Sequence, residues 1–194
     1  MRHLQSGAFA LGMLLSASAM ADADLHFVGT AGLSFGGDKL ATVQYTNGDS
    51  SDVTAGGTVY IAAGGALDFK DSPLSLRVLG GYHVDKAAAQ NGDVTFDRTT
   101  LDAQAFYRIG NHRIGGGLVQ HYSPKYQDDF DGVNAEFKDA TGTSIEYNYL
   151  PEGSKFGFSL RAVFIDYELK TVNNAPAKHT FSGNYVGAGV LLYL

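Results

Sequence analysis

The sequence contains no cysteine and no tryptophan, and only 4 of its 194 residues are proline. Without cysteine the chain has no disulfide, no thiolate-bound zinc or iron–sulfur cluster, and no thiol to carry a lipid anchor. After residue 21 no stretch of about 18 consecutive apolar residues occurs, so we expect no membrane-spanning helix. The chain is rich instead in glycine, with 25 residues, and in aromatic residues, at 12%. So much glycine disfavours long helices and leaves β structure as the expectation.

The N-terminal residues 1–21 have the pattern of a secretory signal peptide. Arg2 precedes an apolar stretch over residues 7–15, and a small-residue cleavage motif ends at Ala21. We therefore expect export, with residues 22–194 forming one mature domain. Removal of the signal leaves 13 basic and 20 acidic residues, a balance that disfavours nucleic acid as a partner.

From Asp24 onward apolar residues recur at every second position, which is typical of strands with one apolar face and one polar face. In the first segment Leu25 and Phe27 share the apolar face, whereas His26 and Thr30 share the other. Each segment is long enough for the 9–11 residues that a tilted membrane-spanning strand needs. The pattern predicts eight strands, over residues 24–35, 58–69, 74–84, 99–108, 113–122, 139–150, 155–169 and 180–194.

The connections between these segments alternate in length. Short turns are expected at residues 70–73, 110–112 and 151–154, and long segments at residues 36–57, 85–97, 123–138 and 170–179. Short turns at one end and long loops at the other are typical of outer-membrane barrels. The sequence therefore predicts an all-β fold, an eight-stranded antiparallel transmembrane β-barrel arranged as an up-and-down meander, with both termini periplasmic. In the first long segment we expect the first two strands to project beyond the membrane, joined at a hairpin signal, Asn47-Gly48.

Charged residues fall on the face opposite the apolar one, which in a barrel of eight strands is the lumen. Such a lumen is just wide enough to be filled by side chains. Across two of the tight turns, Asp68 is a diagonal neighbour of Arg77, and Glu146 is expected to be one of Arg161. Opposite charges buried in this way need one another, because an unpaired buried charge is costly. We expect a polar network in the lumen made of Asp68, Arg77, Asp102, Glu146 and Arg161.

The C-terminal run from Tyr185 to Leu194 alternates small and apolar residues and has tyrosine at the penultimate position. With the strand pattern over residues 22–194, it resembles the small outer-membrane barrels of Gram-negative bacteria, the class of outer-membrane protein X and the transmembrane domain of outer-membrane protein A. That resemblance implies location in the cell outer membrane, insertion by the barrel assembly machinery, and contact with outer-membrane lipid and lipopolysaccharide. It also implies a monomer without cofactor or metal.

One set of residues offers catalytic chemistry: His121 and Ser123 near the end of the fifth segment, with Glu136 in the next loop. Residues i and i+2 of a strand share a face, so an imidazole and a hydroxyl could meet there, oriented by the carboxylate. The set resembles lipid A 3-O-deacylase, which implies Ser123 as nucleophile, His121 as base and Glu136 as its orienting group. That family has asparagine after the serine, whereas this chain has Pro124.

Two further motifs do not carry a site. The acidic run at residues 128–131 lacks the spacing of an EF-hand, and Gly115-Gly116-Gly117 is not followed by the residues of a phosphate loop. The main expectation is therefore a filled barrel without enzymatic activity and with a structural or surface-interaction role. A lipid A hydrolase and a porin-like narrow pore or small-ligand barrel remain as alternatives.

Overall fold

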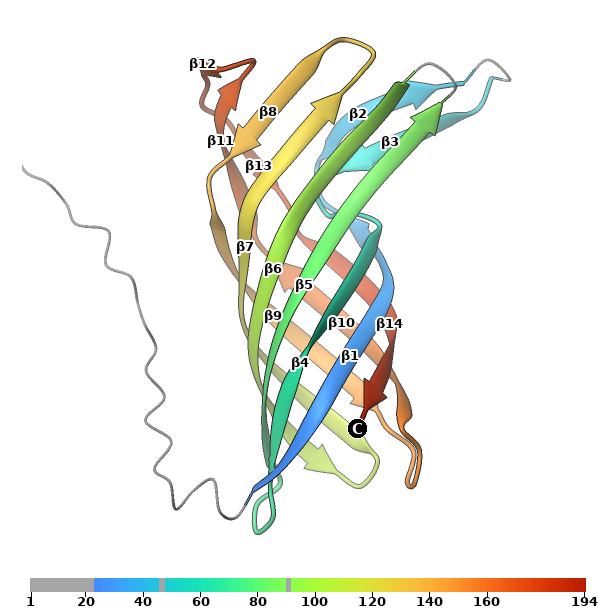
Figure 1. Cartoon of the computed structure of the whole chain (residues 1–194), viewed down its shortest axis with the longest axis vertical. Helices are drawn as coiled ribbons and strands as arrows, with labels where there is room; N and C mark the ends of the chain where they lie inside the picture. Colours follow the sequence, from blue (N-terminus) through green and yellow to red (C-terminus); the bar gives the residue numbers. More distant parts are fainter. Residues whose placement is uncertain (1–22, 46–47, 90–91) are drawn as a thin grey trace, which may run out of the picture.

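The computed structural model describes residues 23–45, 48–89 and 92–194, and eight of its strands form a closed antiparallel ring (Figure 1). The predicted signal peptide lies outside these residues. Among the described residues no helix is suited to crossing a membrane. The ring strands are β1 (Ala23–Gly36), β4 (Val59–Phe69), β5 (Leu74–Ala89), β6 (Gly92–Ile109), β7 (His112–Asp128), β9 (Ala140–Tyr149), β10 (Phe156–Phe164) and β14 (Tyr185–Tyr193).

Each ring strand pairs with the ring strands that precede and follow it in the chain, and the last strand returns to the first. β14 pairs with β1 from Tyr185 opposite Gly36 to Tyr193 opposite Val28. β7 pairs with β9 from His112 opposite Tyr149 to His121 opposite Ala140, which completes the circuit. The prediction of an all-β fold with eight antiparallel strands in chain order is confirmed.

The two faces of the ring differ in the way that the alternation predicts. On β1, Val28, Thr30 and Ser34 point into the ring and are buried, while Leu25 and Phe35 point outward and are 75% and 64% exposed. The same phase holds on β5, where Arg77 and Leu79 are buried and Val78 is exposed. The ring is therefore apolar on its outside and polar on much of its inside.

The two ends of the ring are built differently. Short turns join β4 to β5, β6 to β7 and β9 to β10 at the end where β1 begins and the chain terminates (Figure 1). The backbone nitrogen of Phe27 donates to the carbonyl of Leu194 at 2.8 Å, which holds the first part of β1 beside the C-terminal residue. At the other end the connections are hairpins that extend beyond the ring. We call these the turn end and the hairpin end.

The hairpin end contains more strand than the sequence predicted. β5 and β6 remain paired up to Ala89 opposite Gly92, and β7 continues to Asp128. The segments 85–97 and 123–138, expected as loops, are thus mostly ladder. The additional strands are β2 (Lys39–Gln44), β3 (Ser50–Thr54), β8 (Val133–Phe137), β11 (Asp166–Val172), β12 (Ala175–Pro176) and β13 (Thr180–Ser182).

The expectation that the first two strands project within residues 36–57 is wrong. β2 and β3 form a separate two-stranded sheet with its own register. The chain leaves the ring at Gly36 and Gly37, which have φ values of 132° and 78° that favour glycine. The hairpin can therefore turn away from β1 and β4 and fold over the hairpin end of the ring.

The expected single strands over residues 155–169 and 180–194 are each interrupted. β10 ends at Phe164 and β14 begins at Tyr185. The residues next to these strand ends, Ile165 and Asn184, are hydrogen-bonded to one another. The Ile165 nitrogen donates to the Asn184 side-chain oxygen at 2.8 Å, and the Gly183 nitrogen donates to the Ile165 carbonyl at 2.8 Å. Beyond this point β11 pairs with β8 and β13 instead of with ring strands. Alternation alone continues through such a break and does not reveal it.

The elements at the hairpin end pack around a common apolar cluster, which we call the apolar cap. Its centre is the rings of Phe96, Phe137 and Tyr167, whose centroids lie 5.4 to 6.3 Å apart. The β2–β3 hairpin adds Val43 and Val53 from above. The cap closes the hairpin end of the ring interior with buried side chains.

Gly117 on β7 is expected to tolerate no side chain. A Cβ there would lie 2.0 Å from the Ala103 carbonyl oxygen, whereas a Cβ at the outward-facing Gly80 would meet nothing within 4 Å. We expect Gly117→Ala to lower the free energy of unfolding by about 1–3 kcal/mol, the range for overpacking. Urea titration of both variants tests this, and a loss for Gly80→Ala equal to that for Gly117→Ala would contradict it.

Candidate functional site

The ring interior at the turn end is organised by a single carboxylate, that of Asp68. Arg113 donates to both of its oxygens, at 3.1 and 3.0 Å, and Arg108 lies 3.2 Å from one of them. The hydroxyl of Tyr193, on the final strand, accepts from Arg113 at 2.7 Å and donates to Asp68 at 3.2 Å. Strands β4, β6, β7 and β14 are thereby connected through one buried acid.

The next level of the interior contains a second group of charges. Arg77 donates to Glu146 and to the Gln104 side-chain oxygen, both at 2.6 Å. The Gln104 amide nitrogen donates to Glu146 and to Ser144, both at 3.0 Å. Arg77 and Gln104 are opposite one another in the β5–β6 ladder, whereas their contacts to Glu146 and Ser144 on β9 run across the ring.

A third ion pair lies above this group. Arg161 on β10 donates to Asp102 on β6 at 2.9 Å, and both residues are buried. The guanidinium carbon of Arg161 also lies 5.6 and 5.8 Å from the ring centroids of Tyr60 and Tyr185. These rings pack beside the ion pair, and Tyr185 also belongs to the apolar cap.

The residues expected in the lumen network are thus all buried in the interior, but the expected pairs are not the ones formed. Asp68 is a diagonal neighbour of Arg77 in register, yet its ion pairs are with Arg108 and Arg113. Glu146 lies directly opposite Arg161, not diagonal to it, and pairs with Arg77. The prediction considered adjacent strands only. In a ring this narrow, long side chains reach strands that are distant along the sheet.

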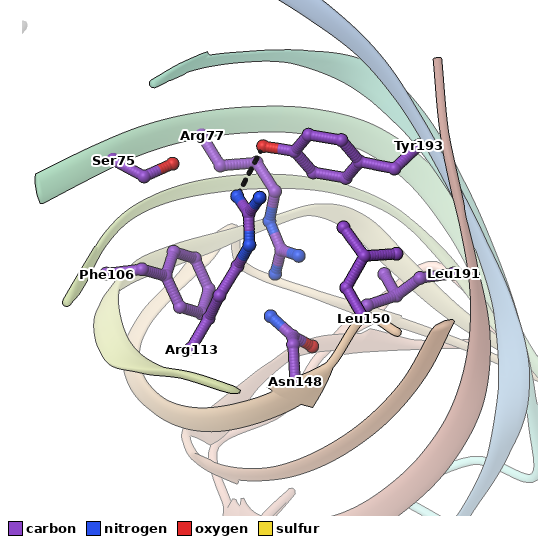
Figure 2. Close-up of a pocket in the computed structure, with 8 residues that line it drawn as sticks. All are labelled: Ser75, Arg77, Phe106, Arg113, Asn148, Leu150, Leu191 and Tyr193. Atoms are coloured by element: carbon purple, nitrogen blue, oxygen red, sulfur yellow. Dashed lines mark hydrogen bonds between the residues drawn. The ribbon is translucent and has the colours of Figure 1, made fainter. Parts of the chain in front are cut away.

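A small cavity lies between the Asp68 group and the Arg77–Glu146 group, the two groups of charges nearest the turn end (Figure 2). Arg77, Arg113, Phe106 and Asn148 point into it, and the Arg113–Tyr193 hydrogen bond lies at one side. The cavity has room for about one water molecule. At this level the ring interior is therefore filled by protein and holds no ligand-sized space.

Next to the apolar cap, the polar interior ends at three buried side chains, those of His83, Arg98 and His121. The Arg98 guanidinium donates to the Gly56 carbonyl at 2.8 Å and lies 2.9 Å from Nδ1 of His83. Nε2 of His83 lies 2.8 Å from the Ser34 hydroxyl. Arg98 is 1% exposed, and its guanidinium carbon lies 4.9 Å from the Phe96 ring centroid, which gives the buried cation an aromatic face.

Asp85 attaches the β2–β3 hairpin to the ring. Its carboxylate accepts hydrogen bonds from the Thr54 nitrogen at 2.7 Å, the Thr54 hydroxyl at 3.1 Å and the Thr58 hydroxyl at 2.7 Å. These three bonds satisfy a buried carboxylate and hold the end of β3 against β5. The hairpin is therefore fastened over the mouth of the ring.

The structure does not bring the three candidate catalytic residues together. His121 points into the ring, is fully buried, and places Nδ1 2.6 Å from the Tyr167 hydroxyl. Ser123 is exposed and has φ of 47°, next to a register shift in the β6–β7 ladder. Glu136 is exposed and contacts Lys170. The i and i+2 rule fails here because the left-handed backbone at Ser123 reverses the phase of the strand.

Several interior residues were not anticipated from the sequence. Arg113 was missed because Gly115-Gly116-Gly117 removes the alternation that would have given the register of β7. Asp85 was missed because residues 85–97 were expected to be a loop, and Arg98 because it lies between that loop and the strand expected over residues 99–108. A signal was present within residues 85–97, since Val94 and Phe96 alternate with polar residues, and both are buried. Among the described residues, no group of His, Asp or Glu side chains is arranged to hold a metal ion.

No protein-family model matches the sequence, and no curated protein matches it. Among solved structures, the crystal structure of Neisserial surface protein A is similar to this chain. The two are 14% identical, the match covers 88% of this chain and 97% of that one, and the TM-score is 0.44.

Proposed function

We propose that this chain is an outer-membrane β-barrel protein with a closed interior and a structural or surface-interaction role. The observation that carries this proposal is the reversed distribution of side chains on the ring. Leu33, Ile61, Ile145 and Phe156 point outward and are exposed, while Arg77 and Glu146 are buried inside. A soluble sheet protein places these groups the other way round, whereas a membrane barrel needs apolar residues facing lipid.

The dimensions of the outward face support a transmembrane position. Near the turn end Tyr107 and Tyr149 point outward, and near the hairpin end Tyr82 and Tyr122 do so. In the ladders Tyr82 and Tyr122 lie on either side of Thr99. The nine residues of β6 from Thr99 to Tyr107 match the 9–11 residues of a tilted spanning strand. The tyrosines then form the two aromatic girdles at the membrane surfaces.

The interior supports a surface role more than a pore. The charges at the turn end bind one another across the ring, and the apolar cap closes the hairpin end. The long β5–β6 and β7–β8 hairpins are the parts that would stand outside the cell. In this proposal the turn end and both termini are periplasmic, as in the resemblance to outer-membrane proteins A and X.

The partners in this proposal follow from the location. The outward apolar face would contact outer-membrane lipid and lipopolysaccharide, and the C-terminal strand would be presented to the barrel assembly machinery. β14 is suited to complete the assembly because it closes the ring against β1. We propose a monomer, since the ring supplies every ring strand with two neighbours of its own chain.

Fractionation of cells that produce the protein tests the proposal. We expect the protein in the outer-membrane fraction and a different gel mobility for boiled and unboiled samples, because a closed ring of eight strands resists unfolding by detergent alone. Recovery in the soluble periplasmic fraction, with one mobility under both conditions, would overturn the proposal.

A further inference from the structure

An outward-facing groove lies at the hairpin end, at the level where β7 stops pairing with β9 and starts pairing with β8. The change of partner occurs between His121, opposite Ala140, and Lys125, opposite Glu136. In Figure 1 β8 lies beside the extended part of β7, and β11 pairs with β8 on its other side. The groove is lined by three lysines, Lys125, Lys138 and Lys170, together with Ser123, Glu136 and Asp139.

Lys125 supplies a cation without an ion pair among the described residues. Its two register partners are Asp97 on β6 and Glu136 on β8, both carboxylates. The Asp97 carboxylate accepts from the Tyr82 hydroxyl at 2.8 Å, and that of Glu136 lies 3.5 Å from Nζ of Lys170. Neither carboxylate forms an ion pair with Lys125 in the part of the chain that the structure describes, so its ammonium is available to an anion in the groove.

The other groove lysines keep donors to spare. Lys138 contacts Glu168 at 2.6 Å, and hydrogen bonding to Lys138 holds the pKa of Glu168 below its ordinary value. An ammonium has three N–H donors, so one carboxylate partner leaves two. Asp139 accepts from the Ser123 nitrogen at 2.8 Å, which directs that acid toward the backbone. The exposed Ser123 side chain adds a hydroxyl to the same groove.

The groove sits directly beyond the outward apolar face. The outward face of β7 includes Ile114, Leu118 and Tyr122, all exposed, and the groove begins at the residue after Tyr122, Ser123. With Tyr122 at the membrane surface, the lysines are at the height of lipid headgroups. In a chain of net charge −6, three of eight lysines line this one groove.

We propose that the groove binds a phosphate group of lipopolysaccharide in the outer leaflet, with Lys125, Lys138 and Lys170 as the donors. This rests on the proposed position in the outer membrane, which puts the hairpin end among phosphorylated headgroups. Lysines next to an anionic surface attract it, and each ammonium can donate directly to phosphate oxygens. The bound lipid would then lie with its acyl chains along the outward face of β7 and β9.

Binding of purified lipid A to the full-length mature protein in phosphatidylcholine nanodiscs tests this inference. The test variant is Lys125→Gln/Lys170→Gln. The matched control is Lys39→Gln/Lys86→Gln, which removes the same charge from two exposed lysines elsewhere at the hairpin end. Each groove lysine is expected to contribute roughly a fivefold factor, so the test variant should bind about 25-fold more weakly. The control should change binding less than about twofold.

Two probes establish which group is recognised. Lipid A from which the phosphates have been removed should bind about as weakly to the original protein as intact lipid A binds to the test variant. Inorganic phosphate at the same concentration as lipid A should not displace it, because free phosphate lacks the acyl chains that lie along the outward face. Equal affinities for test and control variants, equal binding of dephosphorylated lipid A, or displacement by inorganic phosphate would each overturn the inference. Failure of the protein to insert into nanodiscs would instead count against the outer-membrane proposal.

Discussion

Replacement of Arg161 by leucine is expected to lower the free energy of unfolding by about 3–5 kcal/mol. The reason is that the substitution leaves Asp102, which is 2% exposed, as an unpaired carboxylate in the ring interior. No other ion pair of Asp102 is present among the described residues to replace the lost contact. Urea unfolding in lipid vesicles, followed by tyrosine fluorescence and by gel mobility, measures the change.

Two controls separate burial of charge from loss of volume. Lys125→Leu removes a cation from an exposed position and should change stability by no more than about 0.5 kcal/mol. The double variant Asp102→Leu/Arg161→Leu removes both charges and should recover much of the loss, since buried pairs can often be replaced by apolar residues. Equal midpoints for Arg161→Leu and Lys125→Leu would show that the interior is well hydrated.

An epitope inserted at Asp129 is expected to be labelled on intact cells, and one inserted at Asp71 only after the outer membrane is opened. Asp129 lies in the turn between β7 and β8 at the hairpin end, and Asp71 lies in the turn between β4 and β5. Insertion in the longer connection should leave the ring assembled. Insertion at Asp71 should lower the yield, because that turn fixes the register of two ring strands.

Two further insertion sites at the hairpin end check the same orientation. Asn174, between β11 and β12, is a second turn at the hairpin end and should behave as Asp129 does. Asp93 is a poorer site than its place in a predicted loop implied, because it lies in β6 opposite Ala88 and contacts Lys86 at 2.5 Å. Labelling at Asp71 and not at Asp129 on intact cells would reverse the orientation.

The ring could be predicted because period-two alternation states directly which side chains face outward and which face the interior. On β5, Arg77 and Val78 differ so strongly in polarity that only one phase is possible. The same signal failed at the hairpin end. There the chain bends at Ile165 and at Ser123, and the hairpins pack against one another around the apolar cap.

The interior network could be predicted in membership but not in pairing. Alternation assigns Glu146 and Arg161 to the inside, but it contains no information about which strand lies across the ring. Strand tilt and ring diameter decide that Arg77 reaches Glu146 and that Arg161 reaches Asp102. Arg113 could not be assigned to the interior at all, because the glycines at residues 115–117 do not show which face of β7 points inward.

The extension of β7 and β8 beyond the ring has a consequence for how a partner would recognise this hairpin. Their ladder runs from Lys125 opposite Glu136 to Asp128 opposite Val133, and Phe137 anchors it in the apolar cap. Ordering a flexible loop on binding costs about 1–2 kcal/mol of backbone entropy per residue. Here that order already exists before any partner arrives. A partner that recognises this hairpin therefore meets a preorganised structure. Its affinity then depends on shape and charge, without the cost of a folding step.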